Sequence, residues 1–116
     1  MAAPSELRVS KDRKLLTVTF PGHAPFELPA EMLRVLSPSA EVQGHSPEQR
    51  VTVPNKRNVA ILKVEPVGNY AVRITFDDFH DTGIFTWAYL ATLGTEKAER
   101  WQGYLDELER KGLSRG

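Results

Sequence analysis

One histidine lies within a cluster of aspartates in the stretch Asp77-Asp78-Phe79-His80-Asp81, called here the acidic turn. Carboxylate and imidazole groups bind divalent metals and act as general acids and bases, so the acidic turn could do either. The alternative is a solvated turn, in which the aspartates accept hydrogen bonds from their own backbone and His80 packs against a neighbouring loop. No second segment that could supply metal ligands is evident, which favours the interpretation as a solvated turn.

Two other histidines could join His80. His23 lies in a Pro-Gly turn, and His45 lies in the irregular stretch 37–50. Three histidines and an aspartate would suit a metal by ligand type alone. The alternative is that both lie at the surface, because each is in a turn or a flexible loop. The chain has no cysteine, which excludes disulfides, thiolate catalysis and cysteine-based metal sites.

Two serines and one phenylalanine also invite a functional interpretation. Ser37 and Ser39 could be nucleophiles, but no Gly-x-Ser-x-Gly elbow surrounds them, so we interpret them as residues that end a helix. Phe79 lies in the polar turn, where an exposed aromatic ring beside charge suits a protein-binding hot spot. The neighbouring aromatic residues are expected in the core: Phe76, Phe85, Trp87 and Tyr89.

The composition predicts one globular domain over residues 1–116, folded over about 6–112, with 41% hydrophobic and 26% charged residues. Fifteen basic and fifteen acidic residues cancel, so we expect no nucleic-acid binding. The modest basic cluster of Arg50, Lys56 and Arg57 is interpreted as a solvated turn. With no cysteine, no signal peptide and no apolar run of roughly 20 residues, we expect a cytoplasmic protein without membrane association.

Alternating apolar residues predict several strands, expected at residues 7–10, 15–20, 25–28, 59–66 and 83–85, with a fragment at 51–53. The clearest strand is 70–76, where Tyr70, Val72, Ile74 and Phe76 share one face, and we place it centrally. The register of 59–66 is ambiguous, because two different sets of its residues could face the core.

Three helices are predicted. They are expected at Pro29–Leu36, from Thr86 or Trp87 to Leu93 with Gly94 closing the helix, and at Thr95–Lys111 with Thr95 as cap and Gly112 as closing residue. The last has an apolar stripe and three i,i+4 ion pairs, Glu96/Arg100, Asp106/Arg110 and Glu107/Lys111. Residues 37–50 contain too many helix and strand breakers for a regular element, and residues 114–116 are expected to fray.

Two parts of the chain are similar. Leu7-Arg8-Val9 matches Leu62-Lys63-Val64, and His23 matches His80. Each part has a hairpin, a histidine-bearing turn, a short strand and a helix, through either duplication or shared architecture. The sequence therefore predicts an α+β fold, with two hairpin-plus-helix units forming a largely antiparallel sheet covered by helices and a C-terminal amphipathic helix.

Three motifs, in this order, resemble the gamma-butyrobetaine hydroxylase-like N-terminal domain family: Leu33–Val42 (LRVLSPSAEV), Gly68–Val72 (GNYAV) and Asp77–Trp87 (DDFHDTGIFTW). The resemblance covers about the whole folded chain. Members occur as small stand-alone bacterial proteins, as the N-terminal domain of carnitine-biosynthesis oxygenases and joined to iron–sulfur carrier ATPases. The catalytic iron of the oxygenases belongs to a separate downstream domain, absent from this sequence, so the resemblance implies no hydroxylase activity and we expect no enzyme.

In the oxygenases, the similar domain holds a structural zinc through a Cys-x-Cys-x-x-Cys segment and one histidine. The matching positions here are Ser37, Ser39, Val42 and His80. Serine is a poor zinc ligand at neutral pH and valine cannot bind metal, so we expect no zinc and no other cofactor. Phe79 replaces a glycine that is common in the family, which puts a left-handed backbone angle there in doubt.

These observations favour a non-enzymatic accessory or interaction domain with an unknown protein partner. The alternative is a metal-binding protein, centred on His80 and associated with iron–sulfur or oxygenase metabolism. In place of zinc, hydrogen bonds among Ser37, Ser39, Glu41 and His80 could join loop 37–50 to the acidic turn. The expected binding surface consists of Ser37, Ser39, Glu41, His45, Asp77, Asp78, Phe79, His80 and Asp81.

Overall fold

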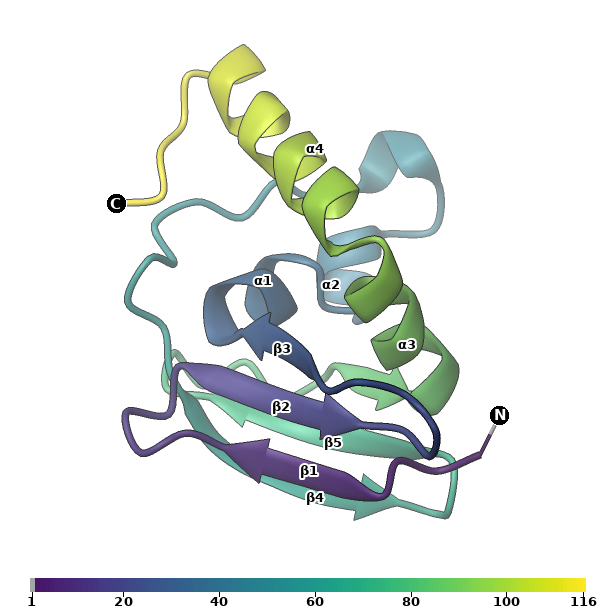
Figure 1. Ribbon diagram of the computed structural model, residues 1–116. Coiled ribbons are helices and arrows are strands. Elements are labelled where there is room, and N and C mark those ends of the chain that lie inside the picture. The colour runs from purple at the N-terminus through teal and green to yellow at the C-terminus, as the bar shows by residue number, and fades with distance from the viewer. Residues whose placement is uncertain (1) are drawn as a thin grey trace.

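The computed structural model describes residues 2–116 and shows the α+β fold that the sequence predicts. Within these residues six strands form two antiparallel three-stranded sheets, and the helices lie to one side of them (Figure 1). In each sheet the third strand leads directly into a helix, so the two hairpin-plus-helix units are confirmed. The strands pair only within their own unit, and the chain therefore builds two sheets where one was expected.

The first sheet has the order β1-β2-β3 and comprises β1 (Glu6–Val9), β2 (Leu15–Thr19) and β3 (Phe26–Pro29). In the central strand, Leu16 pairs with Val9 on one side and Leu28 on the other. Leu16 and Leu28 are fully buried, as expected for apolar residues on the inner face of a sheet. Pro29 then acts as N-cap of α1 (Ala30–Val35), one residue from the predicted start.

The second sheet has the order β4-β5-β6 and comprises β4 (Ile61–Val67), β5 (Ala71–Phe76) and β6 (Ile84–Thr86). The central position of β5 and the burial of Val72, Ile74 and Phe76 are as predicted. Tyr70 was wrongly placed on that face, because the strand begins only at the next residue and Tyr70 is 54% exposed. A register shift between Ile61 and Lys63 resolves the ambiguous register of β4.

Two further helices, α3 (Trp87–Thr95) and α4 (Lys97–Arg110), follow β6. The predicted caps at their junction are wrong. Gly94 lies inside α3, where a Cβ atom would come within 2.4 Å of the Phe26 ring, so its role is close packing of α3 on β3. Thr95 is the last residue of α3, and its hydroxyl donates to Thr92 O of that helix and does not cap α4. Gly112 does close α4, with a φ of +65°.

The predicted ion pairs of α4 are only partly present. Arg100 lies 3.2 Å from Glu96, but Glu107 pairs with Arg50 at 2.5 Å in place of Lys111, which donates to Thr52. No ion pair joins Asp106 and Arg110 in the described chain. Glu107 therefore holds the end of loop 37–50 against α4.

Loop 37–50 contains two short helices, α2 (Ala40–Gln43) and the 3-10 helix η1 (Pro47–Gln49). The strand fragment expected at 51–53 is absent from this region, although Val51 N donates to Val42 O.

The expected fraying of residues 114–116 is wrong. Backbone amides of Asn55 and Arg57 donate to the carbonyls of Ser114 and Arg115, and Arg115 forms two hydrogen bonds with Glu31, of 2.7 and 2.8 Å. Its guanidinium also lies 5.3 Å from the centre of the Trp101 ring. Glu31 is buried in α1 and needs a counter-charge, which holds the tail in place.

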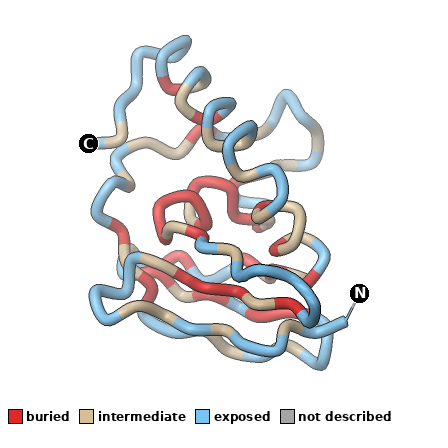
Figure 2. The backbone as a smooth tube through the Cα atoms, in the orientation of Figure 1, coloured by how far each residue is buried: buried red, intermediate tan, exposed pale blue. Residues whose placement is uncertain are grey.

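Buried residues are concentrated in α1, β2 and β5 (Figure 2). Apolar residues of both sheets, α1, α3 and α4 join in one core. None of the helices within residues 2–116 is long and apolar enough to cross a membrane.

Candidate functional site

The acidic turn leaves the end of β5 as a compact, hydrogen-bonded loop. Phe79 N donates to Phe76 O, and Phe76 N donates to His80 O, at 2.9 and 3.0 Å. The Asp78 carboxylate accepts a hydrogen bond from His80 N, as aspartates in turns commonly do. Asp77 exchanges two hydrogen bonds with Ala60, which ties the turn to the start of β4.

Phe79 occupies the tip of this turn with a φ of +69°. The loss of the family's common glycine therefore does not remove the left-handed angle, contrary to the doubt raised by the sequence. A left-handed angle costs roughly 1–2 kcal/mol in a residue with a Cβ atom. The Phe79 side chain recovers none of this by burial, because it is 82% exposed. The hydrogen bonds of its neighbours hold the backbone in this conformation.

His80 points the other way, into the protein, and is 7% exposed. Its Nε2 atom lies 3.0 Å from Ser37 Oγ and its Nδ1 atom 3.3 Å from Glu41 Oε2. We call His80, Ser37 and Glu41 the His80 network. Burial lowers the pKa of His80, and the Arg34 charge lowers it further, against the opposing effect of Glu41 and Asp78. The imidazole is therefore neutral at pH 7, with Nδ1–H donating to Glu41 and Nε2 accepting from Ser37.

The His80 network has the residue types of a Ser-His-acid catalytic triad, including hydrogen-bond distances on both sides of the imidazole. A nucleophile must be open to its substrate, whereas Ser37 is fully buried. A Cβ atom on Gly83 would come within 2.4 Å of Ser37 Oγ, so the hydroxyl lies directly beneath that glycine. The same oxygen also accepts from Ser39 N. In this position Ser37 joins two segments and has no room for a substrate carbonyl.

Ser39 makes a second connection between the same two segments. Its hydroxyl lies 2.7 Å from that of Thr82, and it caps α2 by accepting from Glu41 N. Val42, the third position that matches a zinc cysteine, is buried. One histidine engaged at both nitrogens, two hydrogen-bonded hydroxyls and an alkyl group do not fit a tetrahedral zinc site.

A charged cluster lies beneath the other side of the turn. The Asp78 carboxylate is 2.7 Å from Arg34 Nε and 2.6 Å from Lys56 Nζ. Burial disfavours the ionised carboxylate, but the hydrogen bonds from Lys56, Arg34 and His80 N outweigh it and lower the pKa of Asp78 to about 2. Asp78 is thus an anion at neutral pH and attaches the turn to α1 and to loop 54–58.

Sequence reasoning did not assign Arg34, Lys56 or Thr82 to the site. Arg34 and Lys56 are far from Asp78 in the chain and carry no local signal of their partner. Arg34 and Thr82 lie in the first and third family motifs, so their positions could have been weighed. The predicted basic cluster of Arg50, Lys56 and Arg57 does not gather, because Arg50 binds Glu107 and Arg57 donates to Gly116 O.

The remaining histidines are separate from His80. His45 is exposed, and its amide donates to Gln49. His23 is exposed too, and its ring stacks on Phe26 with centroids 4.7 Å apart. Across residues 2–116 no three histidine or acidic side chains gather in a group that could hold a metal ion. Of the expected surface residues, the structure brings together Ser37, Ser39, Glu41 and the acidic turn, and leaves His45 apart.

Comparison with known proteins gives a consistent result. The family described as "Gamma-butyrobetaine hydroxylase-like, N-terminal" matches residues 7–91. Two proteins with NMR solution structures are similar over 99% of this chain, one at 49% identity with a TM-score of 0.85 over 90% of its own length. The other has 40% identity and a TM-score of 0.83 over 86% of its length.

A crystal structure from Acidithiobacillus ferrooxidans, of a protein of unknown function in the DUF971 family, is also similar. It shares 36% identity over 78% of this chain and 91% of its own, with a TM-score of 0.65. No curated protein matches the chain. The matched residues include α1, the acidic turn and most of α3, and thus the entire candidate site. The chain belongs to the gamma-butyrobetaine hydroxylase-like N-terminal domain family.

Proposed function

We propose that this chain is a non-enzymatic interaction domain that binds a protein partner through the acidic turn, with Phe79 as the anchor. The observation that supports this most strongly is the state of Phe79. It combines an unfavourable backbone angle with an almost fully exposed aromatic side chain. Neither feature stabilises the isolated domain, and strained, exposed residues are typical of functional positions.

The support beneath Phe79 fits this role. Asp78 and His80, its two neighbours in sequence, are both tied to the body of the protein, by Arg34 and Lys56 and by the His80 network. Phe79 is therefore presented on a turn with little freedom to lose on binding. Pre-organisation of this kind reduces the entropic cost of association.

The surroundings of Phe79 indicate the chemistry of the partner. Asp77 and Asp81 are exposed on either side of it. An aromatic anchor between two carboxylates is complementary to an apolar pocket bordered by lysine or arginine. We place this interaction in the cytoplasm, because cytoplasmic proteins rarely contain disulfides and this chain has no cysteine.

The test is site-specific photo-crosslinking in the cells that produce the protein. A benzophenone amino acid replaces Phe79 in one variant and Tyr70 in the other. Tyr70 is a matched control, because it is also an exposed aromatic residue but lies at the opposite end of β5. Tyr70 precedes this strand, and the acidic turn follows the strand. We expect one protein to crosslink from position 79 and not from position 70. Binding of that protein, once purified, should be lost with Phe79→Ala and kept with Tyr70→Ala. Equal binding by both variants would contradict the proposal.

A further inference from the structure

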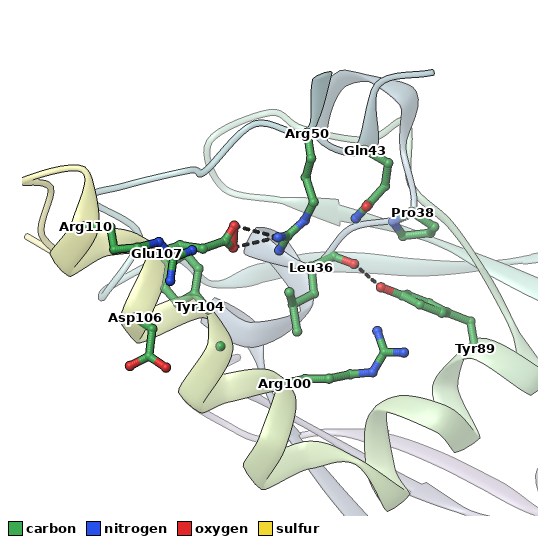
Figure 3. Close-up of a pocket in the computed structure, with 11 residues that line it drawn as sticks. Leu36, Pro38, Gln43, Arg50, Tyr89, Arg100, Tyr104, Asp106, Glu107 and Arg110 are labelled. Carbon is green, nitrogen blue, oxygen red and sulfur yellow. Dashed lines mark hydrogen bonds and ion pairs between the residues drawn. The ribbon is translucent and has the colours of Figure 1, made fainter. Parts of the chain in front are cut away.

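A cleft of about 660 Å³ opens between α4 and the segment from Leu36 to Arg50. Figure 3 shows it with the side chains of α3 and α4 on one side and those of the loop on the other. Its volume lies within the range of roughly 300–1,000 Å³ of small-molecule sites. The His80 network and the acidic turn do not line it, so it is a separate feature.

Among the arginines that line this cleft, Arg110 also has unused hydrogen-bonding capacity in the described chain, but Arg100 is the one that lies over the Tyr89 ring. The Arg100 Nε atom donates to Glu96, while its Nη1 and Nη2 atoms have no hydrogen-bond partner within residues 2–116. The guanidinium is turned toward Tyr89 in Figure 3, with its carbon 5.9 Å from the ring centre. The two free nitrogens form the edge that binds a carboxylate or phosphate in a bidentate manner.

The other charged groups leave this edge available. Arg50 directs its Nη1 atom at both oxygens of Glu107, which neutralises that carboxylate. Tyr89 donates its hydroxyl to Leu36 O, and burial raises the pKa of the phenol against the effect of Arg100 and Arg50. The tyrosine therefore offers the cleft a fixed, neutral ring face.

Gly103 provides an independent observation. It lies in the middle of α4, where glycine costs about 1 kcal/mol relative to alanine. A Cβ atom there would meet nothing within 4 Å, so no contact inside the protein explains the glycine. Gly103 lines the cleft, one turn after Arg100, and leaves space for something outside the chain to approach the helix.

We propose that this cleft binds a small organic anion that has a flat apolar body. Its carboxylate or phosphate group binds the free edge of Arg100, and its body lies against the Tyr89 ring and the bare backbone at Gly103. Leu36 and Pro38 complete the apolar wall. This site is independent of the protein partner proposed for Phe79.

Titration of the ¹⁵N-labelled protein, followed by amide NMR shifts, tests this site. The probes are benzoate, phenyl phosphate and inorganic phosphate, each at millimolar concentration. We expect saturable shifts at Tyr89, Arg100 and Gly103 with at least one of the first two. The stronger of these identifies the head group, and weaker binding of inorganic phosphate supports the role of the apolar body.

Variants separate this site from general charge effects. Arg100→Gln should weaken binding about tenfold or more, the usual weight of a hydrogen bond to a charged group. The matched control Arg8→Gln removes an exposed arginine of β1 and should leave binding unchanged. Gly103→Leu should fill the cleft and abolish binding while melting at or above the wild-type temperature. Absence of saturable shifts with all three probes, or wild-type affinity in Arg100→Gln, would overturn the proposal.

Discussion

His80 Nε2 lies 3.0 Å from Ser37 Oγ, and this buried contact connects two segments that are 43 residues apart in sequence. The family resemblance implies that the matching residues of the zinc-holding oxygenase domains are a histidine and a cysteine. Here a hydrogen bond makes the connection directly. The acidic turn is thus held by the hydrogen bond between His80 and Ser37 and by the ion pairs of Asp78.

Removal of the imidazole should loosen this connection. His80→Ala removes the acceptor of the buried Ser37 hydroxyl proton and leaves the oxygen only its hydrogen bond from Ser39 N, and an unsatisfied buried donor costs roughly 1–3 kcal/mol. We expect urea unfolding to show a loss of about 2 kcal/mol, with faster amide exchange in residues 37–43. His23→Ala, an exposed control, should change stability by less than about 0.5 kcal/mol. Equal stability of the two variants would show that the His80 network is dispensable.

Asp78 should make the protein sensitive to acid. Its folded-state pKa of about 2 lies below the ordinary value of 3.8, so the unfolded chain takes up the proton first. The stabilisation is complete above about pH 5 and is lost as the pH falls through the folded-state pKa of about 2. The lowered pKa corresponds to roughly 2 kcal/mol.

Asp78→Asn should therefore reduce stability at pH 7 and remove this part of the acid dependence. Asp81→Asn, an exposed aspartate in the same turn, should leave both nearly unchanged. Urea unfolding between pH 2 and pH 7 measures the two effects. An unchanged acid profile in Asp78→Asn would rule out the ionic attachment of the turn.

The success of the sequence predictions depended on whether their evidence was local. The clear alternation of β5 and the apolar stripe of α4 identified both elements. Gly94 was wrongly predicted to close a helix. The absence of a side chain there allows α3 to pack closely against Phe26, which lies on a distant strand. The approach of Ser37 to His80 was anticipated only through the family resemblance.

Other parts of the site depend on partners that no local pattern reveals. Arg34 and Lys56 reach Asp78 from α1 and from a loop, and neither is marked by its neighbours in sequence. Glu31 lies in the first turn of α1, where the helix dipole makes acidic residues common. Its burial, which recruits Arg115, follows from how α1 packs in the core and could not be read from spacing.

The Arg115–Glu31 pair should be important for stability. Arg115→Ala leaves a buried carboxylate without its counter-charge, which typically costs about 3 kcal/mol. The double variant Glu31→Gln/Arg115→Ala should recover much of this loss, because the uncompensated charge is gone. Arg8→Ala, which disrupts an exposed pair, should have little effect. Thermal unfolding compares the four proteins, and an Arg115→Ala variant as stable as Arg8→Ala would contradict this role.

Restoring thiolates should restore metal binding if the serines and valine occupy former ligand positions. We expect Ser37→Cys/Ser39→Cys/Val42→Cys to bind one zinc ion per chain, since three thiolates and an imidazole form a common structural zinc site. Adding His80→Ala to this variant should weaken zinc binding. Elemental analysis and competition with a chelator measure both. Failure of the triple variant to retain zinc would show that these positions are not equivalent to the ligands of the relatives.

Phe79→Gly tests the central claim most directly, because it separates binding from folding. Glycine adopts a φ of +69° freely, so the free energy of unfolding should rise by about 1 kcal/mol. Loss of the exposed ring should at the same time abolish binding to the partner identified by crosslinking at position 79, while Tyr70→Ala binds normally. A partner that binds Phe79→Gly as tightly as the wild-type protein would contradict the assignment of the acidic turn as the interaction surface.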